Sequence, residues 1–143
     1  MIRKLYPWEK ELIVPLVRSF HAEAKIGSEF SSERLLATLA STQHTVIGMF
    51  ADEGLVGVLI ALKVPQILTT AWLAQEMVWY IHPEHRGTRE AVLMFDVFEQ
   101  WAADQKVYAI SVANLTDGNP TILKFYAQRG YRNIETHHLK ILP

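Results

Sequence analysis

The chain has 143 residues, half of them hydrophobic, no cysteine and a formal net charge of −1 at pH 7. This length suits one domain, 1–143, whose core is large enough to fold without cross-links, and the lack of cysteine excludes disulfides and thiolate metal sites. The balanced charge gives no support for a nucleic-acid partner, and no apolar run approaches the length of a membrane span. The first residues lack the apolar core of a signal peptide, so we expect a cytoplasmic location.

The first forty residues predict one strand and two helices. A short strand is expected at residues 2–6, before a proline. Apolar residues then recur at helical spacing over residues 8–23, although Pro15 should kink this helix. A second helix is expected to run to Ala40, with Ser31 or Ser32 at its N-cap.

Three strands and a helix should follow. Residues 44–51 and 55–64 form a predicted hairpin around the turn Asp52-Glu53-Gly54. Residues 69–81 are apolar enough for a strand covered on both faces, and residues 91–103 have the pattern of an amphipathic helix. The residues of this helix expected to point mostly inward are Val92, Leu93, Phe95, Val97, Phe98 and Trp101.

The last third of the chain predicts a buried strand at residues 107–112 and a helix that begins at Asn119-Pro120. Gly130 should end this helix, and residues 131–141 predict a final strand or hairpin. The fold class is therefore α/β. We expect a mixed, mostly antiparallel central sheet of about six to seven strands, with about four helices on both faces.

The most informative stretch, residues 82–91, joins a buried strand to a helix through a basic turn. The first N–H groups of a helix have no partner within the helix, and the helix dipole adds positive charge there. A phosphate can bind at such an end, and Arg86 and Arg89 would add charge. The alternative is an ordinary turn with two solvated arginines.

The sequence Ile81-x-Pro83-x-x-Arg86-Gly87-x-x-x-Ala91 resembles the acetyl-CoA-binding motif of the GNAT family of N-acetyltransferases. That family has Arg or Gln, two residues, Gly, one residue, then Gly or Ala. Arg86 and Ala91 match the first and last positions, whereas Arg89 replaces the central glycine. The order of the predicted elements also resembles that family.

The resemblance implies acetyl-CoA as co-substrate, bound beside the strand at 73–81 and by the loop that follows it. The residues that it assigns to the cofactor are Val78, Ile81, Arg86, Gly87, Thr88, Arg89, Glu90, Ala91 and Asn119.

Asn119, Tyr126 and Gly130-Tyr131 are similar to a second pattern of this family. By resemblance, Asn119 contacts the pantetheine arm and Tyr126 is the general acid for the departing thiolate. The alternatives are a plain helix cap for Asn119 and a core aromatic with a solvated hydroxyl for Tyr126.

Glu76 is a carboxylate in an apolar strand, and burial raises carboxyl pKa values into the range useful to a base. Several family members use a glutamate on this strand, so Glu76 is the candidate general base. The alternative is that Glu76 is solvated or paired with a basic side chain. The histidines show no metal-ligand spacing, and no metal is expected.

The segment after the first helix commonly lines the acceptor pocket in this family. Its candidate acceptor contacts are Phe20, His21, Glu23 and Phe30, whereas the alternative, preferred for Glu23 and Glu29, is that these two are solvated surface charges. The expected function is direct acetyl transfer from acetyl-CoA to a small-molecule or protein amine. The alternative is a non-catalytic binding or regulatory protein on the same fold. No nucleic acid or membrane is expected as a partner, and a homodimer is left open.

Overall fold

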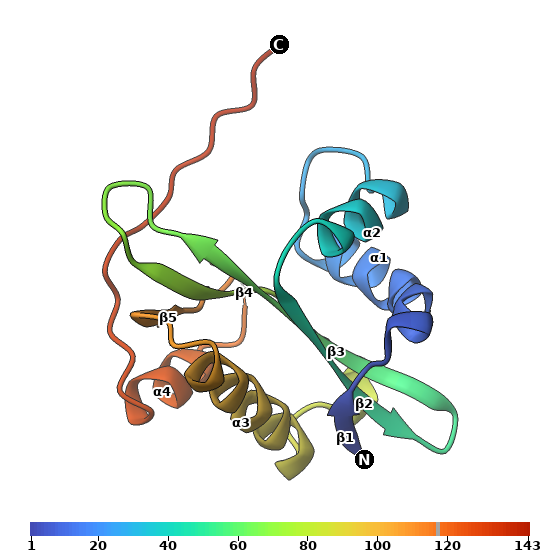
Figure 1. Ribbon diagram of the computed structural model, residues 1–143. Coiled ribbons are helices and arrows are strands. Elements are labelled where there is room, and N and C mark those ends of the chain that lie inside the picture. The colour runs from blue at the N-terminus through green and yellow to red at the C-terminus, as the bar shows by residue number, and fades with distance from the viewer. Residues whose placement is uncertain (117) are drawn as a thin grey trace. The chain divides into compact units, whose positions relative to one another are not determined.

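The computed structural model describes residues 1–116 and 118–143, which form two compact units, Met1–Val112 and Ala113–Pro143. The first unit contains one five-stranded mixed sheet with the order β1-β2-β3-β4-β5 (Figure 1). Neighbouring strands from β1 to β4 are antiparallel, and β5 is parallel to β4. The strands are β1 (Ile2–Lys4), β2 (His44–Ala51), β3 (Gly54–Pro65), β4 (Trp72–Ile81) and β5 (Ala109–Ser111).

Helices cover both faces of this sheet, as predicted. Helices α1 (Val14–Glu23) and α2 (Ser32–Ala40) lie on one face, and α3 (Arg89–Asp104) lies on the other (Figure 1). Two further short helical turns are η1 (Pro7–Ile13) and η2 (Pro83–His85), both of the 3-10 type. The fourth α-helix of the described residues, α4 (Thr121–Gln128), belongs to the second unit.

The predicted kinked helix at 8–23 is instead the 3-10 segment η1 followed by α1. Pro15 lies in the first turn of α1, where a proline removes no helical hydrogen bond and its fixed φ suits the helix. The predicted serine cap of α2 is confirmed, because the Ser31 hydroxyl accepts a hydrogen bond from the Arg34 N–H at 3.1 Å.

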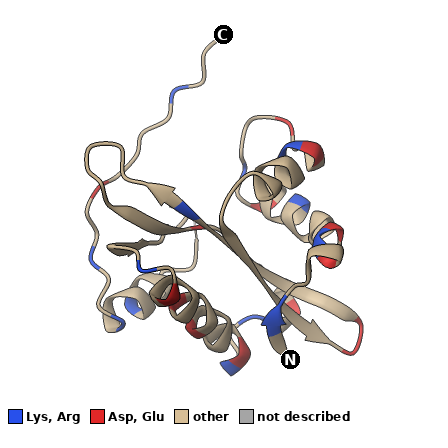
Figure 2. Cartoon of the chain, in the orientation of Figure 1, with Lys and Arg blue, Asp and Glu red and all other residues tan. Residues whose placement is uncertain are grey.

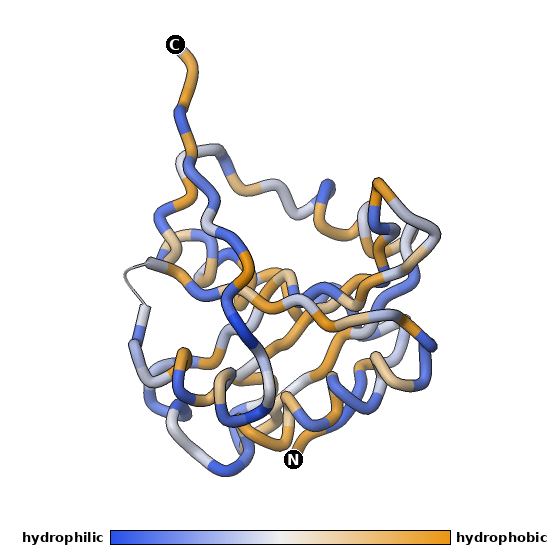
Figure 3. The backbone as a smooth tube through the Cα atoms, turned by 90° about the vertical axis from the view of Figure 1, so that its left-hand side faces the viewer, coloured by the Kyte–Doolittle hydropathy of each residue, from blue (hydrophilic) through white to orange (hydrophobic). Residues whose placement is uncertain are grey.

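The core of the first unit lies on both sides of the sheet. On the α1 and α2 side, residues such as Leu16, Val58 and Ile60 form one buried cluster. On the α3 side, Phe95 and Phe98 are fully buried. The alternation of hydrophobic and hydrophilic stretches along the chain can be followed in Figure 3.

Two of the inward positions predicted for α3 are wrong. Val92 and Leu93 are 37% and 39% exposed, whereas the helix buries Met94 and Ala102 together with its aromatic residues. The helix begins at Arg89, and its buried face is a narrow stripe of positions three and four residues apart. Apolar residues beside that stripe therefore stay partly in solvent.

The sheet has five strands, so the prediction of six to seven is wrong. The missing element is the final strand or hairpin expected at 131–141, because residues 131–143 contain no helix or strand. Ile134, Leu139 and Ile141 are 73–88% exposed there. An alternating pattern alone does not make a strand, since a strand also needs a neighbouring backbone for its N–H and C=O groups.

The second unit is built on α4, and Gly130, with φ of +89°, follows its end as the sequence predicted. The prediction of a single domain stays a prediction. Across residues 1–116 and 118–143, no helix combines the length and the apolar character needed to cross a bilayer.

Candidate functional site

The segment between β4 and α3 has the geometry of an anion site. Gly87 has φ of +73°, a conformation that L side chains rarely adopt, and it leads the chain from η2 to the helix. Thr88 is the N-cap of α3, but its side chain makes no capping bond and instead donates to the His85 carbonyl at 3.4 Å. Within the described residues, the backbone N–H groups of Thr88, Arg89 and Glu90 therefore have no acceptor.

Arg86 does not extend freely from this loop. Its Nε donates to the Ile81 carbonyl oxygen at 2.6 Å, and its Nη2 donates to Glu23 Oε2 at 2.8 Å. The guanidinium carbon lies 5.3 Å from the centre of the Tyr80 ring. Glu23 raises the already high pKa of Arg86 further through this hydrogen bond, and the Arg86 side chain is still 41% exposed.

Arg89, which replaces the glycine of the family motif, has a different environment. Its side chain is exposed and makes no hydrogen bond or ion pair with the described residues. Its neighbour Glu90 pairs with the Met1 amino group at 3.5 Å, and Ala91 closes the first turn through its N–H on the Thr88 carbonyl at 3.2 Å. Figure 2 shows charges of both signs at this end of α3. Arg89 is thus an exposed cation beside the N–H groups that have no acceptor.

Strand β4 leads into this loop with one edge open. Its parallel pairing with β5 ends at Gln75, opposite Ser111, so β4 from Glu76 to Ile81 has no strand beside it on that edge among the described residues. On the other edge, the register with β3 shifts, because Ile60 faces Val78 and Ala61 faces Glu76. Met77 is therefore the extra residue of a β-bulge, which turns the backbone of β4 at this point.

Glu76 lies beside the bulge and is partly buried. Gln75 pairs with Leu62 and Glu76 with Ala61, so the two neighbours point to opposite faces, as expected. Burial raises the pKa of Glu76 from 4.5 to about 7. No basic side chain of the described residues pairs with it, which removes the ion-pair alternative for that part of the chain.

Asn119 and Tyr126 belong to the second unit. Pro120 is the N-cap of α4, and the Asn119 Oδ1 accepts a hydrogen bond from the N–H of the first helical residue, Thr121, at 3.0 Å, which leaves the Asn119 amide N–H₂ unused by that bond. The Tyr126 side chain is 7% exposed, and its hydroxyl donates to the Ala113 carbonyl at 3.1 Å. Its ring lies 5.7 Å from that of Tyr131. Tyr126 is therefore a buried aromatic whose hydroxyl is bonded rather than merely solvated.

The candidate acceptor contacts near the end of α1, and the two glutamates there, differ in their partners and in their exposure. His21 donates from Nε2 to the Ser28 carbonyl at 2.7 Å, and its ring lies 5.8 Å from that of Phe30. Glu23 holds Arg86, whereas Glu29 is exposed. The Glu23 contact was not predicted, because neither residue carries a local signal of a partner 63 positions away.

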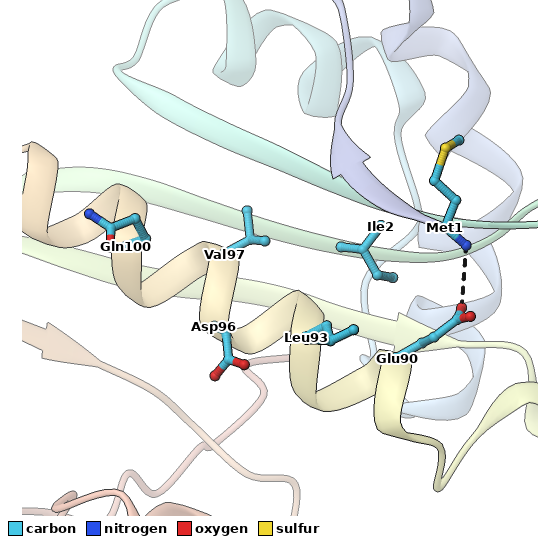
Figure 4. Close-up of a pocket in the computed structure, with 7 residues that line it drawn as sticks. All are labelled: Met1, Ile2, Glu90, Leu93, Asp96, Val97 and Gln100. Atoms are coloured by element: carbon cyan, nitrogen blue, oxygen red, sulfur yellow. Dashed lines mark hydrogen bonds and ion pairs between the residues drawn. The ribbon is translucent and has the colours of Figure 1, made fainter.

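A shallow hollow of about 400 Å³ lies between β1 and the start of α3 (Figure 4). Ile2, Leu93 and Val97 give it an apolar lining, and Glu90 is the one predicted site residue that lines it. The Glu90 side chain is directed to the Met1 amino group there, so a contact of Glu90 with a phosphate would have to come from its backbone. No cluster of three or more potential metal ligands is found among residues 1–116 and 118–143.

Several solved structures of acetyltransferases have a fold similar to that of this chain. A ribosomal-protein-alanine N-acetyltransferase from Brucella melitensis biovar Abortus 2308 is 22% identical, with a TM-score of 0.75 and coverage of 99% of this chain and 98% of that one. An aminoglycoside acetyltransferase from an uncultured soil metagenomic sample, in complex with sisomicin, is 18% identical, with a TM-score of 0.78 and coverage of 100% and 96%. A transcriptional regulator from Bacillus halodurans C-125 is 18% identical, with a TM-score of 0.74 and coverage of 99% and 98%.

No curated protein matches the chain. The sequence model of the acetyltransferase (GNAT) family, in contrast, matches residues 11–131, which include β4, the loop after it and α4. The matched residues contain both motifs identified in the sequence, at 81–91 and 119–131, and most of the helices and strands. The chain belongs to the GNAT acetyltransferase family.

Proposed function

We propose that the protein is an N-acetyltransferase that moves the acetyl group of acetyl-CoA directly to an amine. The observation that carries this proposal is the continuous arrangement of an open β4 edge, a glycine turn and three unpaired N–H groups at the start of α3. The open strand edge suits the amides of a pantetheine arm, and the N–H groups suit a pyrophosphate.

Each part of the donor has a proposed partner in the chain. The backbone of β4 between Val78 and Ile81 pairs with the pantetheine amides, and Asn119 binds the same arm through its side-chain amide. The N–H groups of residues 86–91 bind the pyrophosphate, with Arg89 adding a positive charge. A backbone N–H beside the Met77 bulge donates to the thioester oxygen and stabilises the negative charge that develops on it.

Acetyl-CoA supplies the acetyl group as a thioester, which is already activated toward an amine. The amine nitrogen attacks the carbonyl carbon as the carbon–sulfur bond breaks. Glu76, or a water that it orders, accepts the proton of the amine, and the pKa of about 7 suits a base near neutral pH. Tyr126 donates its hydroxyl proton to the departing thiolate. Holding the donor and the acceptor together supplies much of the rate.

The acceptor is proposed as an amine of a small molecule or a protein. Relatives of the same fold include an aminoglycoside acetyltransferase and an enzyme that acts on a ribosomal-protein alanine, so both acceptor classes occur on this scaffold. A cytoplasmic location and the lack of a nucleic-acid partner stay predictions, and a homodimer stays an open alternative.

A non-catalytic binding or regulatory role is the second candidate, and one observation favours it. Arg89 stands where the family has a glycine that lets the backbone approach the pyrophosphate. A transcriptional regulator is also among the proteins with this fold.

A thermal shift with acetyl-CoA separates the two candidates. Ligand at one hundred times its dissociation constant should stabilise the protein by about 2.7 kcal/mol. Release of free CoA with a panel of amines then identifies the acceptor. No shift at millimolar acetyl-CoA would contradict the enzymatic proposal and favour the regulatory one.

Arg86→Ala should weaken the binding of CoA by about 1–3 kcal/mol, the scale of a lost charge-assisted hydrogen bond. The reason is that the variant removes a guanidinium that joins the loop to the end of β4 and to α1. Isothermal titration calorimetry with CoA measures the change. An unchanged affinity would mean that this loop is not the donor site.

Arg89→Gly should leave the affinity for CoA intact or lower it less than Arg86→Ala does. The Arg89 side chain is exposed and makes no hydrogen bond or ion pair with the described residues, so its removal should leave the loop backbone in place. The same calorimetry compares the two variants. A larger loss for Arg89→Gly would show that this side chain has taken over the binding role of the missing glycine.

A further inference from the structure

Glu23 is the last residue of α1, and its carboxylate reaches Arg86 across 63 positions of sequence. Arg86 belongs to the loop that precedes α3, so this one ion pair links the helix on one face of the sheet to the loop at the end of β4. Both side chains are about half exposed, at 41% for Arg86 and 49% for Glu23. Such a pair adds little to folding stability.

The guanidinium of Arg86 is held at two points. The bond from Nε to the Ile81 carbonyl, at 2.6 Å, fixes the base of the group to the end of β4. The bond from Nη2 to Glu23, at 2.8 Å, then fixes the direction of its plane, with the Tyr80 ring beside it. Glu23 therefore adds a second anchor to the Arg86 guanidinium, besides the Ile81 carbonyl.

A rigid Arg86 side chain also restrains its own backbone. Arg86 is extended, with φ of −78° and ψ of 159°, and the turn at Gly87 follows directly. The unpaired N–H groups begin two residues after Arg86. Fixing the loop before a ligand arrives reduces the entropy lost on binding, which increases the affinity.

We propose that Glu23 is a positioning residue for the acyl donor, which sets the 86–91 loop for the pyrophosphate by holding Arg86. The proposal rests on the proposed function, because it takes CoA as the ligand of this loop. It also gives Glu23 a role different from that of an acceptor contact or a surface charge. Through this pair, the end of α1, where the His21 ring lies against that of Phe30, is coupled to the donor loop.

The direction of the effect distinguishes positioning from simple electrostatics. CoA carries several phosphate charges, and the Glu23 carboxylate is negative, so Coulomb repulsion alone predicts tighter binding of CoA once Glu23 is removed. Positioning predicts weaker binding, because Arg86 loses its second anchor. A solvated surface charge without either role predicts no measurable change.

The test is calorimetry of CoA binding to the full chain with Glu23→Ala, Glu23→Gln and a control, Glu33→Ala. The control removes an exposed carboxylate from the first turn of α2. We expect Glu23→Ala to weaken CoA binding about fivefold, the scale of an exposed ion pair. Glu23→Gln keeps an acceptor oxygen for Nη2 and should restore the affinity to within about twofold of the wild type. The thermal stability of all three variants should match that of the wild type.

A double-mutant cycle with Arg86→Ala completes the test. In the Arg86→Ala background, Glu23→Ala should have no further effect on CoA affinity, since Glu23 acts through Arg86. Equal or tighter binding in the single variant Glu23→Ala, or an undiminished effect in the double variant, would overturn the proposal. Failure of the wild-type protein to bind CoA would instead reject the proposed function, and this proposal with it.

Discussion

Tyr126→Phe is expected to slow acetyl transfer by about 10–100-fold with nearly unchanged affinity for CoA, up to the lower end of the range of general acid catalysis. The substitution keeps the ring and its packing against Tyr131 and removes only the hydroxyl. That hydroxyl is the proposed proton source for the thiolate, and it donates to the Ala113 carbonyl in the structure. Steady-state turnover and CoA calorimetry measure the two quantities separately.

Tyr131→Phe is the matched control, because it removes a second hydroxyl from the same ring cluster. It should leave turnover close to that of the wild type. Loss of the bond to Ala113 should cost Tyr126→Phe about 1 kcal/mol of stability, so thermal unfolding must accompany the kinetics. Full activity of Tyr126→Phe would remove the general acid from the mechanism and leave the proposed donor site untouched.

Glu76→Gln should lower turnover most at pH values below the pKa of the acceptor amine. The amine is then protonated, and the reaction needs a base to accept its proton. At high pH the amine is already neutral, so the activity of the variant should recover toward that of the wild type. A profile of rate against pH for both proteins measures this difference. An identical profile would mean that water or a histidine acts as the base.

The same substitution should make folding stability less dependent on pH. The pKa of Glu76 is raised from 4.5 to about 7 by burial, so the folded state holds the proton more tightly than the unfolded state does. The resulting stability is fully present below pH 4.5 and is lost as the pH rises through 7. A pKa rise of this size corresponds to about 3 kcal/mol at most. Glu76→Gln has no such loss, so its stability relative to the wild type should increase between pH 4.5 and 8.

Urea denaturation of both proteins across this pH range measures the effect, with Glu11→Gln as the control for an exposed carboxylate. The control should follow the pH dependence of the wild type. A constant difference between Glu76→Gln and the wild type at every pH would show that Glu76 titrates normally. That result would also weaken its assignment as the base, because the raised pKa would then be absent.

Local patterns in the sequence determined much of this protein. The turn at 52–54, the serine cap of α2 and the helix end before Gly130 were all predicted, because turn and cap chemistry depends on residues within a few positions. The motif at 81–91 and its family were also found from the sequence, since a strand, a glycine turn and a helix start are contiguous. The kink expected at Pro15 was wrong, because the effect of a proline depends on where the helix begins, which periodicity alone does not fix.

The tertiary structure decided the features that depend on distant partners. The pair of Glu23 with Arg86 joins two side chains whose own neighbours in sequence give no sign of it. The bulge at Met77 and the burial of Glu76 follow from the register between β3 and β4, which is set by pairing and not by composition. Residues 131–141 have a strand pattern but form no strand, because a strand forms only where another backbone supplies its hydrogen bonds. Periodicity describes one chain segment, whereas pairing, burial and the pKa values that follow from them are properties of two segments in contact.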